Sequence, residues 1–263
     1  MSTLPVDIYS VAAVREIDRT AIEDHGIPGY TLMTRAGAAA VSEARSMFPD
    51  ARRWHVVCGA GNNAGDGYVV ARLAAQEGIV VSVVALVDPG SLKGDAAAAY
   101  RDFAAEGGVV SAWAGQLDAE ADLIVDALLG SGLERDVEGE FALAVAAINS
   151  HPAAVVALDI PTGIHGDTGN VMGFAVRADL TVTFVGLKEG LFLGDGPEYG
   201  GALAFTDLGV PPQCRQALDA AFRRVDDDHM RRTLAPRRRT AHKGDFGHVL
   251  VVGGGPGMPG AVR

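Results

Sequence analysis

Four polar, glycine-rich segments carry most of the residues that could do chemistry. They span residues 59–67, 126–132, 159–163 and 185–190, and each follows a short apolar run. Short apolar runs separated by helical patterns indicate parallel strands that are buried on both faces. In an open parallel sheet, ligands bind beyond the carboxyl ends of the strands. We therefore expect the four segments to meet at one edge of a sheet and to share one ligand.

The first segment, residues 59–67, is open to two interpretations. It satisfies the pattern G-x-G-x-x-A through Gly59, Gly61 and Ala64, and Asp88 lies roughly where a ribose-binding acid would follow. Its backbone N–H groups at a helix N-terminus would suit a phosphate. Glycine turns between strand and helix also occur for conformational reasons alone, so this pattern by itself is weak. No Gly-Lys-Ser/Thr follows, which excludes a P-loop.

Asp126 and Asp159 each end an apolar run, which would place both carboxylates at the same sheet edge. An aspartate in this position often only caps the following turn. With Asn63 and Thr162, however, the two acids form a set of oxygen donors that suits a hard cation. Lys188 follows a further strand, and its alternative role is that of a solvated surface lysine.

The elements that must position these residues follow from hydrophobic periodicity. Strands are predicted at residues 55–58, 80–87, 123–126, 154–158 and 181–184, with an edge strand at 202–205. Helices are predicted at residues 66–78, 96–105 and 141–149. Two further helices lead the chain, the first capped by Ser10 and the second ending before Pro49. The fold class is therefore α/β, and the leading pair is a candidate packing or homodimerisation element.

Composition narrows the choice of partners and compartment. The 263 residues carry 22 Lys and Arg against 33 Asp and Glu, a net charge of −11, which argues against nucleic-acid and membrane-surface partners. The two cysteines form no disulfide framework, and we find neither a signal peptide nor a bilayer-length apolar run, so we expect a cytoplasmic protein. Cys58 lies in a predicted strand and is expected in the core. The seven histidines show no metal-ligand spacing.

Taken together and in order, the four segments resemble the NAD(P)H-hydrate epimerase family, the YjeF N-terminal domain. Asn62-Asn-Ala-Gly-Asp-Gly67 stands for the family's Asn-Asn-Gly-Gly-Asp-Gly, and Asp126-Ala-Leu-Leu-Gly-Ser-Gly132 for Asp-Ala-Leu-Phe-Gly-Thr-Gly. Asp159-Ile-Pro-Thr-Gly163 is similar to Asp-Ile-Pro-Ser-Gly, and Phe184-Val-Gly-Leu-Lys188 is similar to the last motif. The resemblance runs from about residue 8 to residue 210. Each motif is short, but four in the right order are specific.

The resemblance implies a Rossmann-like three-layer α/β/α sandwich with a mostly parallel sheet and two leading helices. Family members interconvert the R and S forms of hydrated NADH and NADPH, which carry a hydroxyl at C6 of the reduced nicotinamide ring. The residues that would contact this dinucleotide are Asn62, Asn63, Ala64, Gly65, Asp66, Gly130, Ser131, Gly132, Leu133, Glu134, Arg135, Asp136 and Asp159. A potassium ion would be held by Asn63, Asp126 and Thr162, and no organic cofactor is implied.

Two residues depart from the family pattern. Ala64 replaces a glycine, which adds a methyl group where the backbone could need a positive φ or a close approach to the ligand. Thr162 replaces the commoner serine but keeps the hydroxyl, so we expect little effect from it.

The chemistry of the implied reaction asks for an acid and a base. C6 of the hydrate is a hemiaminal carbon, so the ring nitrogen can expel the hydroxyl once an acid protonates it. Water then returns on the opposite face with the help of a base, and one carboxylate in a partly dry site can serve both roles. We assign this role to Asp159, with Lys188 as a candidate for tuning its pKa or transferring a proton. Potassium would be structural, organising the loops.

Two other functions fit parts of the sequence. A non-catalytic nucleotide-binding or scaffold protein could use the same fold, but it would have no reason to keep Asp159 together with the cation site. An NAD-dependent dehydrogenase would not need the extended Asn-Asn loop, and it would need a partner domain for its second substrate. We therefore favour the epimerase.

The end of the chain differs in charge from the rest. Residues 223–243 carry a net charge of +5, against −16 elsewhere. The sequence from His242 onward resembles the opening of the ADP- or ATP-dependent NAD(P)H-hydrate dehydratase domain, which follows the epimerase in bifunctional members. We therefore expect an epimerase domain at 1–220, a basic linker at 221–241 and a truncated dehydratase start at 242–263. So short a segment cannot bury a core of its own, and we expect no dehydratase activity from it.

Overall fold

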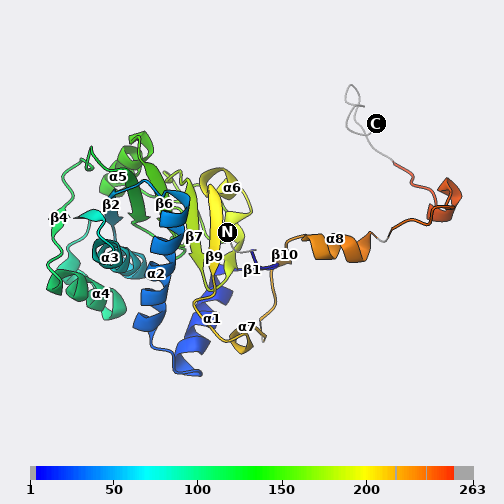
Figure 1. The fold of residues 1–263 in the computed structure, drawn as a ribbon, viewed down its shortest axis with the longest axis horizontal. Helices are drawn as coiled ribbons and strands as arrows, with labels where there is room; N and C mark the ends of the chain where they lie inside the picture. Colours follow the sequence, from blue (N-terminus) through cyan, green and yellow to red (C-terminus); the bar gives the residue numbers. More distant parts are fainter. Residues whose placement is uncertain (1–3, 217, 235, 252–263) are drawn as a thin grey trace. The chain divides into compact units, whose positions relative to one another are not determined.

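The computed structural model describes residues 4–216, 218–234 and 236–251. The described chain falls into two compact units, residues 4–224 and residues 225–251, and each is described by itself (Figure 1). The predicted dehydratase start reaches into residues 252–263, which lie outside the described residues.

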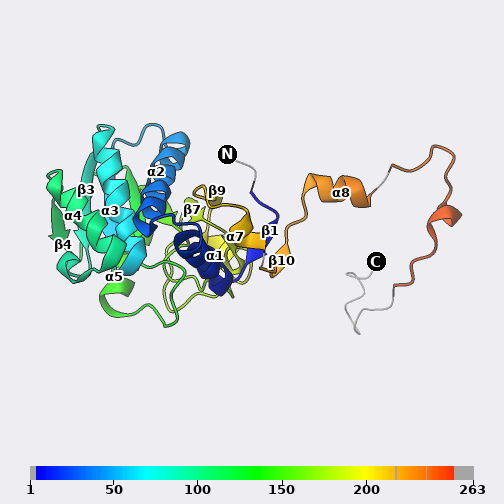
Figure 2. The same cartoon turned by 90° about the horizontal axis from the view of Figure 1, so that it is seen from below.

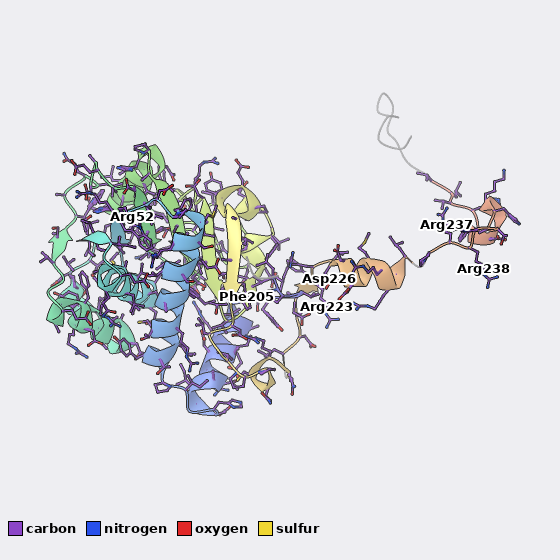
Figure 3. The ribbon with its side chains drawn as sticks, viewed as in Figure 1. Arg52, Phe205, Arg223, Asp226, Arg237 and Arg238 are labelled. Atoms are coloured by element: carbon purple, nitrogen blue, oxygen red, sulfur yellow. The ribbon has the colours of Figure 1, made fainter. Side chains whose placement is uncertain are left out.

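A seven-stranded parallel sheet forms the centre of the first unit. Its strand order is β4-β3-β2-β5-β6-β7-β9, and every neighbouring pair is parallel. The strands are β2 (Arg53–Cys58), β3 (Val80–Ala85), β4 (Val110–Ala112), β5 (Leu123–Ala127), β6 (Ala154–Leu158), β7 (Leu180–Phe184) and β9 (Ala202–Thr206). β9 is the predicted edge strand, and Phe205 is labelled on it in Figure 3. The order reverses between β2 and β5, a switch point of the kind at which ligands bind.

Helices cover both faces of this sheet. They are α1 (Val11–Glu23), α2 (Gly29–Met47), α3 (Gly61–Gln76), α4 (Gly94–Ala105) and α5 (Gly139–Ser150) (Figure 2). In β2, Trp54 and Val56 pack in the core cluster that contains α1–α4, whereas Val57 packs in a second cluster with α5. This alternation is what a strand buried on both faces requires. The predicted three-layer α/β/α fold is confirmed.

A second, three-stranded sheet lies beside the first in the same unit. Its order is β10-β1-β8, with β1 (Asp7–Tyr9) antiparallel to β10 (Phe222–Arg223) and parallel to β8 (Leu187–Lys188). Tyr9 is in register with Lys188, so the start of the chain supports the strand that carries this lysine. β10 brings two residues of the predicted linker into the first unit.

Short elements complete the described chain. In the first unit these are η1 (Pro89–Ser91), η2 (Glu189–Leu191), α6 (Gly196–Tyr199) and α7 (Gln213–Gln216). The second unit has α8 (Asp227–Thr233) and η3 (Lys243–Phe246). The Arg237 guanidinium lies 4.6 Å from the centre of the Phe246 ring. None of its described residues is buried.

The Asn-Asn segment differs from its prediction as a loop. α3 begins at Gly61, so residues 62–66 form its first turns. Gly59 lies in the turn before α3. Glycine is required there, because a Cβ would lie 2.7 Å from the Leu128 carbonyl carbon. The strands β1, β4, β8 and β10 were not predicted, since two or three residues are too few to show a period.

Close packing of α2 on α3 gives a test of this architecture. A Cβ added at Gly37 of α2 would lie 2.8 Å from the Val69 Cβ of α3. We expect Gly37→Ala to lower the free energy of unfolding by about 1–3 kcal/mol, because overpacking outweighs the gain in helix propensity. Ala38→Val, at an exposed position of the same helix, should cost less than about 1 kcal/mol. Urea unfolding measures both, and a Gly37→Ala protein more stable than the wild type would contradict the packing.

Candidate functional site

A cleft of about 730 Å³ lies at the switch point of the sheet, beyond the carboxyl ends of its strands. Its walls come from α1, α2, the first turns of α3 and the segments that follow β5, β6 and β7. Most residues predicted to bind substrate line it: Asn62, Asn63 and Asp66 from α3, residues 130–135 after β5, and Asp159 after β6. Lys188 of β8 lines it too. The four polar segments therefore do converge.

Three predicted contact residues do not line the cleft. Ala64 and Gly65 face away from it, because residues 62, 63 and 66 share the opposite side of α3. Ala64 is fully buried in the core and has no positive φ, so its methyl group packs without the strain that the sequence suggested. Asp136 is exposed and lies outside the lining.

Asp159 and Lys188 form an ion pair at the end of the cleft. Lys188 is 1% exposed, and its ammonium also donates to the Thr183 hydroxyl at 3.0 Å and the Phe184 carbonyl at 2.9 Å. All three donors of the ammonium therefore have acceptors, as a buried charge requires. The second carboxylate oxygen of Asp159 accepts from the Ser131 backbone N–H at 3.2 Å. Burial alone would raise the pKa of Asp159, but Lys188 and Ser131 hold it below its usual value.

The backbone around this pair is strained. In the described chain, the non-glycine residues with positive φ are Asp159, Val185 and Leu208, and all three line the cleft. Such a φ is costly, most of all for a β-branched valine. The Val185 carbonyl accepts from the Arg215 guanidinium at 2.9 Å, and the Leu208 carbonyl accepts from that of Arg35 at 2.7 Å. The strained residues all line one cleft, and neighbouring arginines bind two of their carbonyls. Such clustered strain is typical of a functional site.

Asp126 and Thr162 form a second polar centre beneath the cleft. Both are fully buried, and Asp126 accepts from the Thr162 hydroxyl at 2.7 Å and the Thr162 backbone N–H at 2.8 Å. Burial raises the pKa of Asp126 to about 6, although these hydrogen bonds act to lower it. The Thr162 hydroxyl also accepts from the Leu129 N–H at 2.9 Å, which ties this centre to the loop lining the cleft.

Asn63 is a buried amide that lines the cleft. Its side chain is 7% exposed, and neither its oxygen nor its nitrogen has a hydrogen-bond partner among the described residues. A Cβ added at Gly130, the residue after Leu129, would lie 3.5 Å from the Asn63 side chain and 3.4 Å from an Asp159 oxygen. Buried amides are normally paired, so this orphan points to a ligand or ion.

Asp18 is a site residue that the sequence analysis missed. It lies on α1 and lines the cleft with Asp66, and the structure gives neither carboxyl a hydrogen-bond partner within the described ranges. Burial raises the pKa of Asp18 to about 6, with Lys188 opposing and Asp159 adding to the shift. Burial, Asp159 and Asp18 raise the pKa of Asp66 well above its usual value. The sequence held one sign of this role, an aspartate on the otherwise apolar face of the first helix.

Other candidates lie elsewhere. Cys58 is fully buried in the core as predicted, and burial raises the pKa of its thiol. Asp88 caps η1 by accepting from the Gly90 N–H at 2.9 Å and does not line the cleft. Within the described ranges, no three His, Cys, Asp or Glu side chains gather as a metal site. No helix of the described chain is long and apolar enough to cross a membrane.

The raised pKa of Asp18 gives a pH-dependent prediction. The fold disfavours the ionised form of Asp18. The free energy of unfolding therefore falls as pH rises from about 4 to 6, and it keeps this full loss above that range. Asp18→Asn should therefore raise the free energy of unfolding at pH 8, by at most about 3 kcal/mol, and should have little effect below pH 4. Urea titrations at both pH values measure this, with the exposed Asp219→Asn as a control. A variant less stable than wild type at pH 8 would contradict the assignment.

Known proteins resemble this chain at several levels. It is 40% identical over 261 residues to the bifunctional NAD(P)H-hydrate repair enzyme Nnr of Escherichia coli, covering 99% of this chain and 50% of that protein. The corresponding protein of Coxiella burnetii is 42% identical over 256 residues, covering 97% and 52%. That of Leishmania major is 37% identical over 265 residues, covering 97% and 47%. The chain thus spans about half the length of these curated relatives.

Fold and family agree with these relatives. The crystal structure of yeast ynu0, YNL200c, matches with a TM-score of 0.69 and 19% identity, covering 80% of this chain and 92% of that one, and so supports the fold. The family described as YjeF-related protein N-terminus matches residues 29–190, which hold all four polar segments. The chain belongs to this family of YjeF-related protein N-termini.

Proposed function

We propose that the first unit is an epimerase that interconverts the R and S forms of hydrated NADH and NADPH. The observation that carries this proposal is the charge arrangement in the cleft. One carboxylate, Asp159, is held ionised by a buried lysine, while the carboxyls of Asp18 and Asp66 have raised pKa values. The relatives are named for repair of the NAD(P)H hydrate, and these carboxyls are candidates for the acid and the base that such a substrate needs.

The proposed reaction proceeds through loss and return of water at C6. A carboxylic acid protonates the C6 hydroxyl, the C–O bond breaks, and the lone pair of the ring nitrogen forms a C=N bond as water leaves. Water then adds to C6 from the opposite face and gives up a proton to a carboxylate. The two steps move one proton from acid to base, and exchange with solvent restores the starting state.

The structure favours two different carboxyls for these roles. Asp159 starts as a carboxylate beside Lys188, so it suits the base. The pKa of Asp66 is raised well above its usual value, so Asp66 suits the acid. This divides between Asp66 and Asp159 the work that the sequence analysis gave to Asp159. Lys188 acts through Asp159, by orienting its carboxylate and keeping it ionised.

Substrate contacts and the potassium site remain part of the proposal. The first turn of α3 and residues 130–135 would bind the dinucleotide, whereas the buried positions of Ala64 and Gly65 favour packing roles. Asn63, Asp126 and Thr162 offer amide, carboxylate and hydroxyl oxygens, and the unpartnered Asn63 oxygen fits a cation ligand. Potassium would supply a fixed positive charge that orders the loops around these residues.

We extend the proposal to the oligomeric state, the cellular location and the C-terminal residues. A homodimer through α1 and α2 is a proposal, although the apolar faces of both helices already pack in the core. A cytoplasmic location is likewise proposed, from the composition. A dehydratase start at residues 242–263 is supported by the longer relatives and by the exposed apolar residues 249–251, which suit a strand of a further sheet.

The alternatives make different predictions for this site. A scaffold protein would not need a base held beside carboxyls of raised pKa. A dehydrogenase would use Asp88 on a ribose, but this carboxylate caps η1 outside the cleft. We therefore propose the epimerase in preference to both.

Replacing the base tests the mechanism. Asp159→Asn should lower kcat for R-to-S exchange by about 10²- to 10⁴-fold, because the amide cannot accept the proton. Asp88→Asn should leave the rate unchanged, whereas a dehydrogenase-like binding mode would make it sensitive. Chromatography of the separated epimers, corrected for spontaneous exchange, gives the rates, and circular dichroism checks folding. Full exchange by Asp159→Asn would remove the mechanism, and no exchange by the wild type would remove the function.

Potassium binding has a readout that does not depend on activity. Raising potassium chloride at constant ionic strength, against choline chloride, should raise the Tm by several degrees through preferential binding to the folded state. Asn63→Ala should abolish this rise, and Asn62→Ala, in the same turn but exposed, should retain it. Equal Tm values for the wild type in both salts would show that the site binds no potassium.

A further inference from the structure

Helix α1 forms one wall of the cleft, and it lies outside the residues that match the family. Val14, Arg15 and Asp18 line the cleft from this helix. The Arg15 guanidinium reaches the loop that follows β5, since a Cβ added at Gly132 would lie 2.9 Å from it. α1 therefore brings a positive charge to the cleft in addition to packing on the core.

Most arginines of the first unit are already engaged. The guanidinium groups with a carboxylate or carbonyl partner are those of Arg19, Arg35, Arg45, Arg53, Arg72, Arg177, Arg215, Arg223 and Arg224. Among the described residues, the structure gives no such partner to Arg15, Arg52, Arg101 or Arg135. Two of these four, Arg15 and Arg135, line the cleft. A pair of uncommitted guanidinium groups in a concave site suits an anion, above all a phosphate.

The first turn of α3 lines the same cleft and adds to this preference. It has no acidic residue, and Ala60 before it offers no side-chain cap, so the first N–H groups of the helix are free to face an anion. The amide nitrogen of the buried Asn63 in this turn lacks a partner among the described residues, so it can donate to an anion while the oxygen binds the proposed cation. Arg15 and α3 line the same cleft and can thus contact one phosphate-bearing ligand.

We propose that Arg15, together with Arg135, binds the diphosphate of the dinucleotide. This inference rests on the proposed function and adds to it a binding residue from α1. Arg15 lies three residues from Asp18 on the same helix, and Asp18 interacts electrostatically with Asp159 and Lys188. One helical turn is about 5 Å, which places Arg15 near the reacting end of the cleft. In a dinucleotide the diphosphate lies next to the nicotinamide riboside, whereas a 2′-phosphate lies at the distant adenosine end.

If Arg15 binds the diphosphate, its replacement should affect the two hydrates equally. Arg15→Gln should raise KM at least about tenfold for the NADH-derived and the NADPH-derived hydrate alike, with kcat within about twofold, because a charge-assisted hydrogen bond to the phosphate is lost. Arg52→Gln is the matched control. Arg52 is an uncommitted arginine directly before β2, at the end of that strand opposite the cleft (Figure 3).

A binding measurement separates this inference from the epimerase proposal. Titration calorimetry with ADP-ribose, which carries the diphosphate but no nicotinamide ring, should give a Kd at least about tenfold weaker for Arg15→Gln than for Arg52→Gln or the wild type. If the wild type binds ADP-ribose through Arg15 but epimerises neither hydrate, the subsite stands and the proposed function fails. If epimerisation is normal and Arg15→Gln behaves like Arg52→Gln, the function stands and the subsite is wrong. A rise in KM for the NADPH-derived hydrate alone would overturn the assignment to the diphosphate.

Discussion

The ammonium of Lys188 is a charge almost wholly removed from water, and much of the local structure follows from the need to satisfy it. A buried charge is tolerated only when it is paired and hydrogen-bonded, and removal of one partner leaves a large uncompensated cost. The acceptors are Asp159, directly after β6, and Thr183 and Phe184, the last two residues of β7. Satisfying Lys188 therefore fixes the position of the Asp159 carboxylate in the cleft.

The backbone strain is a second consequence of the same arrangement. Asp159 and Val185 both have positive φ, and each follows directly after a strand, at residue 158 or 184, that runs toward the cleft. The left-handed conformation ends the extended strand at each of these two residues. Arg215 and Arg35 hold the carbonyls of Val185 and Leu208 from the outside. The cost of the strain is thus offset by contacts with helices α7 and α2, which makes their packing part of the site.

The sequence predicted the features that depend on local pattern. Apolar runs located every strand of the main sheet except the short β4, and their carboxyl ends located Asp126 and Asp159, because strand direction alone brings such ends to one edge. The role of Asp18 depends on a long-range contact, the packing of α1 across the cleft edge of the sheet, which a local pattern does not show. An aspartate on a helix also normally marks the face exposed to solvent. The pairing of β1 with β8 likewise joins short segments distant in sequence that show no period. Backbone strain was expected at Ala64 only because its segment was predicted as a loop. A helical position accepts alanine readily.

The small sheet β10-β1-β8 joins both ends of the first unit to the strand of Lys188. During synthesis β1 is made first and β8 follows much later, while Phe222 and Arg223 of β10 come last. Until then one edge of β1 has open backbone groups, and a loop of most of the unit's length must close before they are paired. The strand that neighbours Lys188 is therefore completed only when the ribosome has released nearly the whole unit. Nascent chains that end before residue 222 would have the main sheet and its helices, but β1 would lack its antiparallel partner.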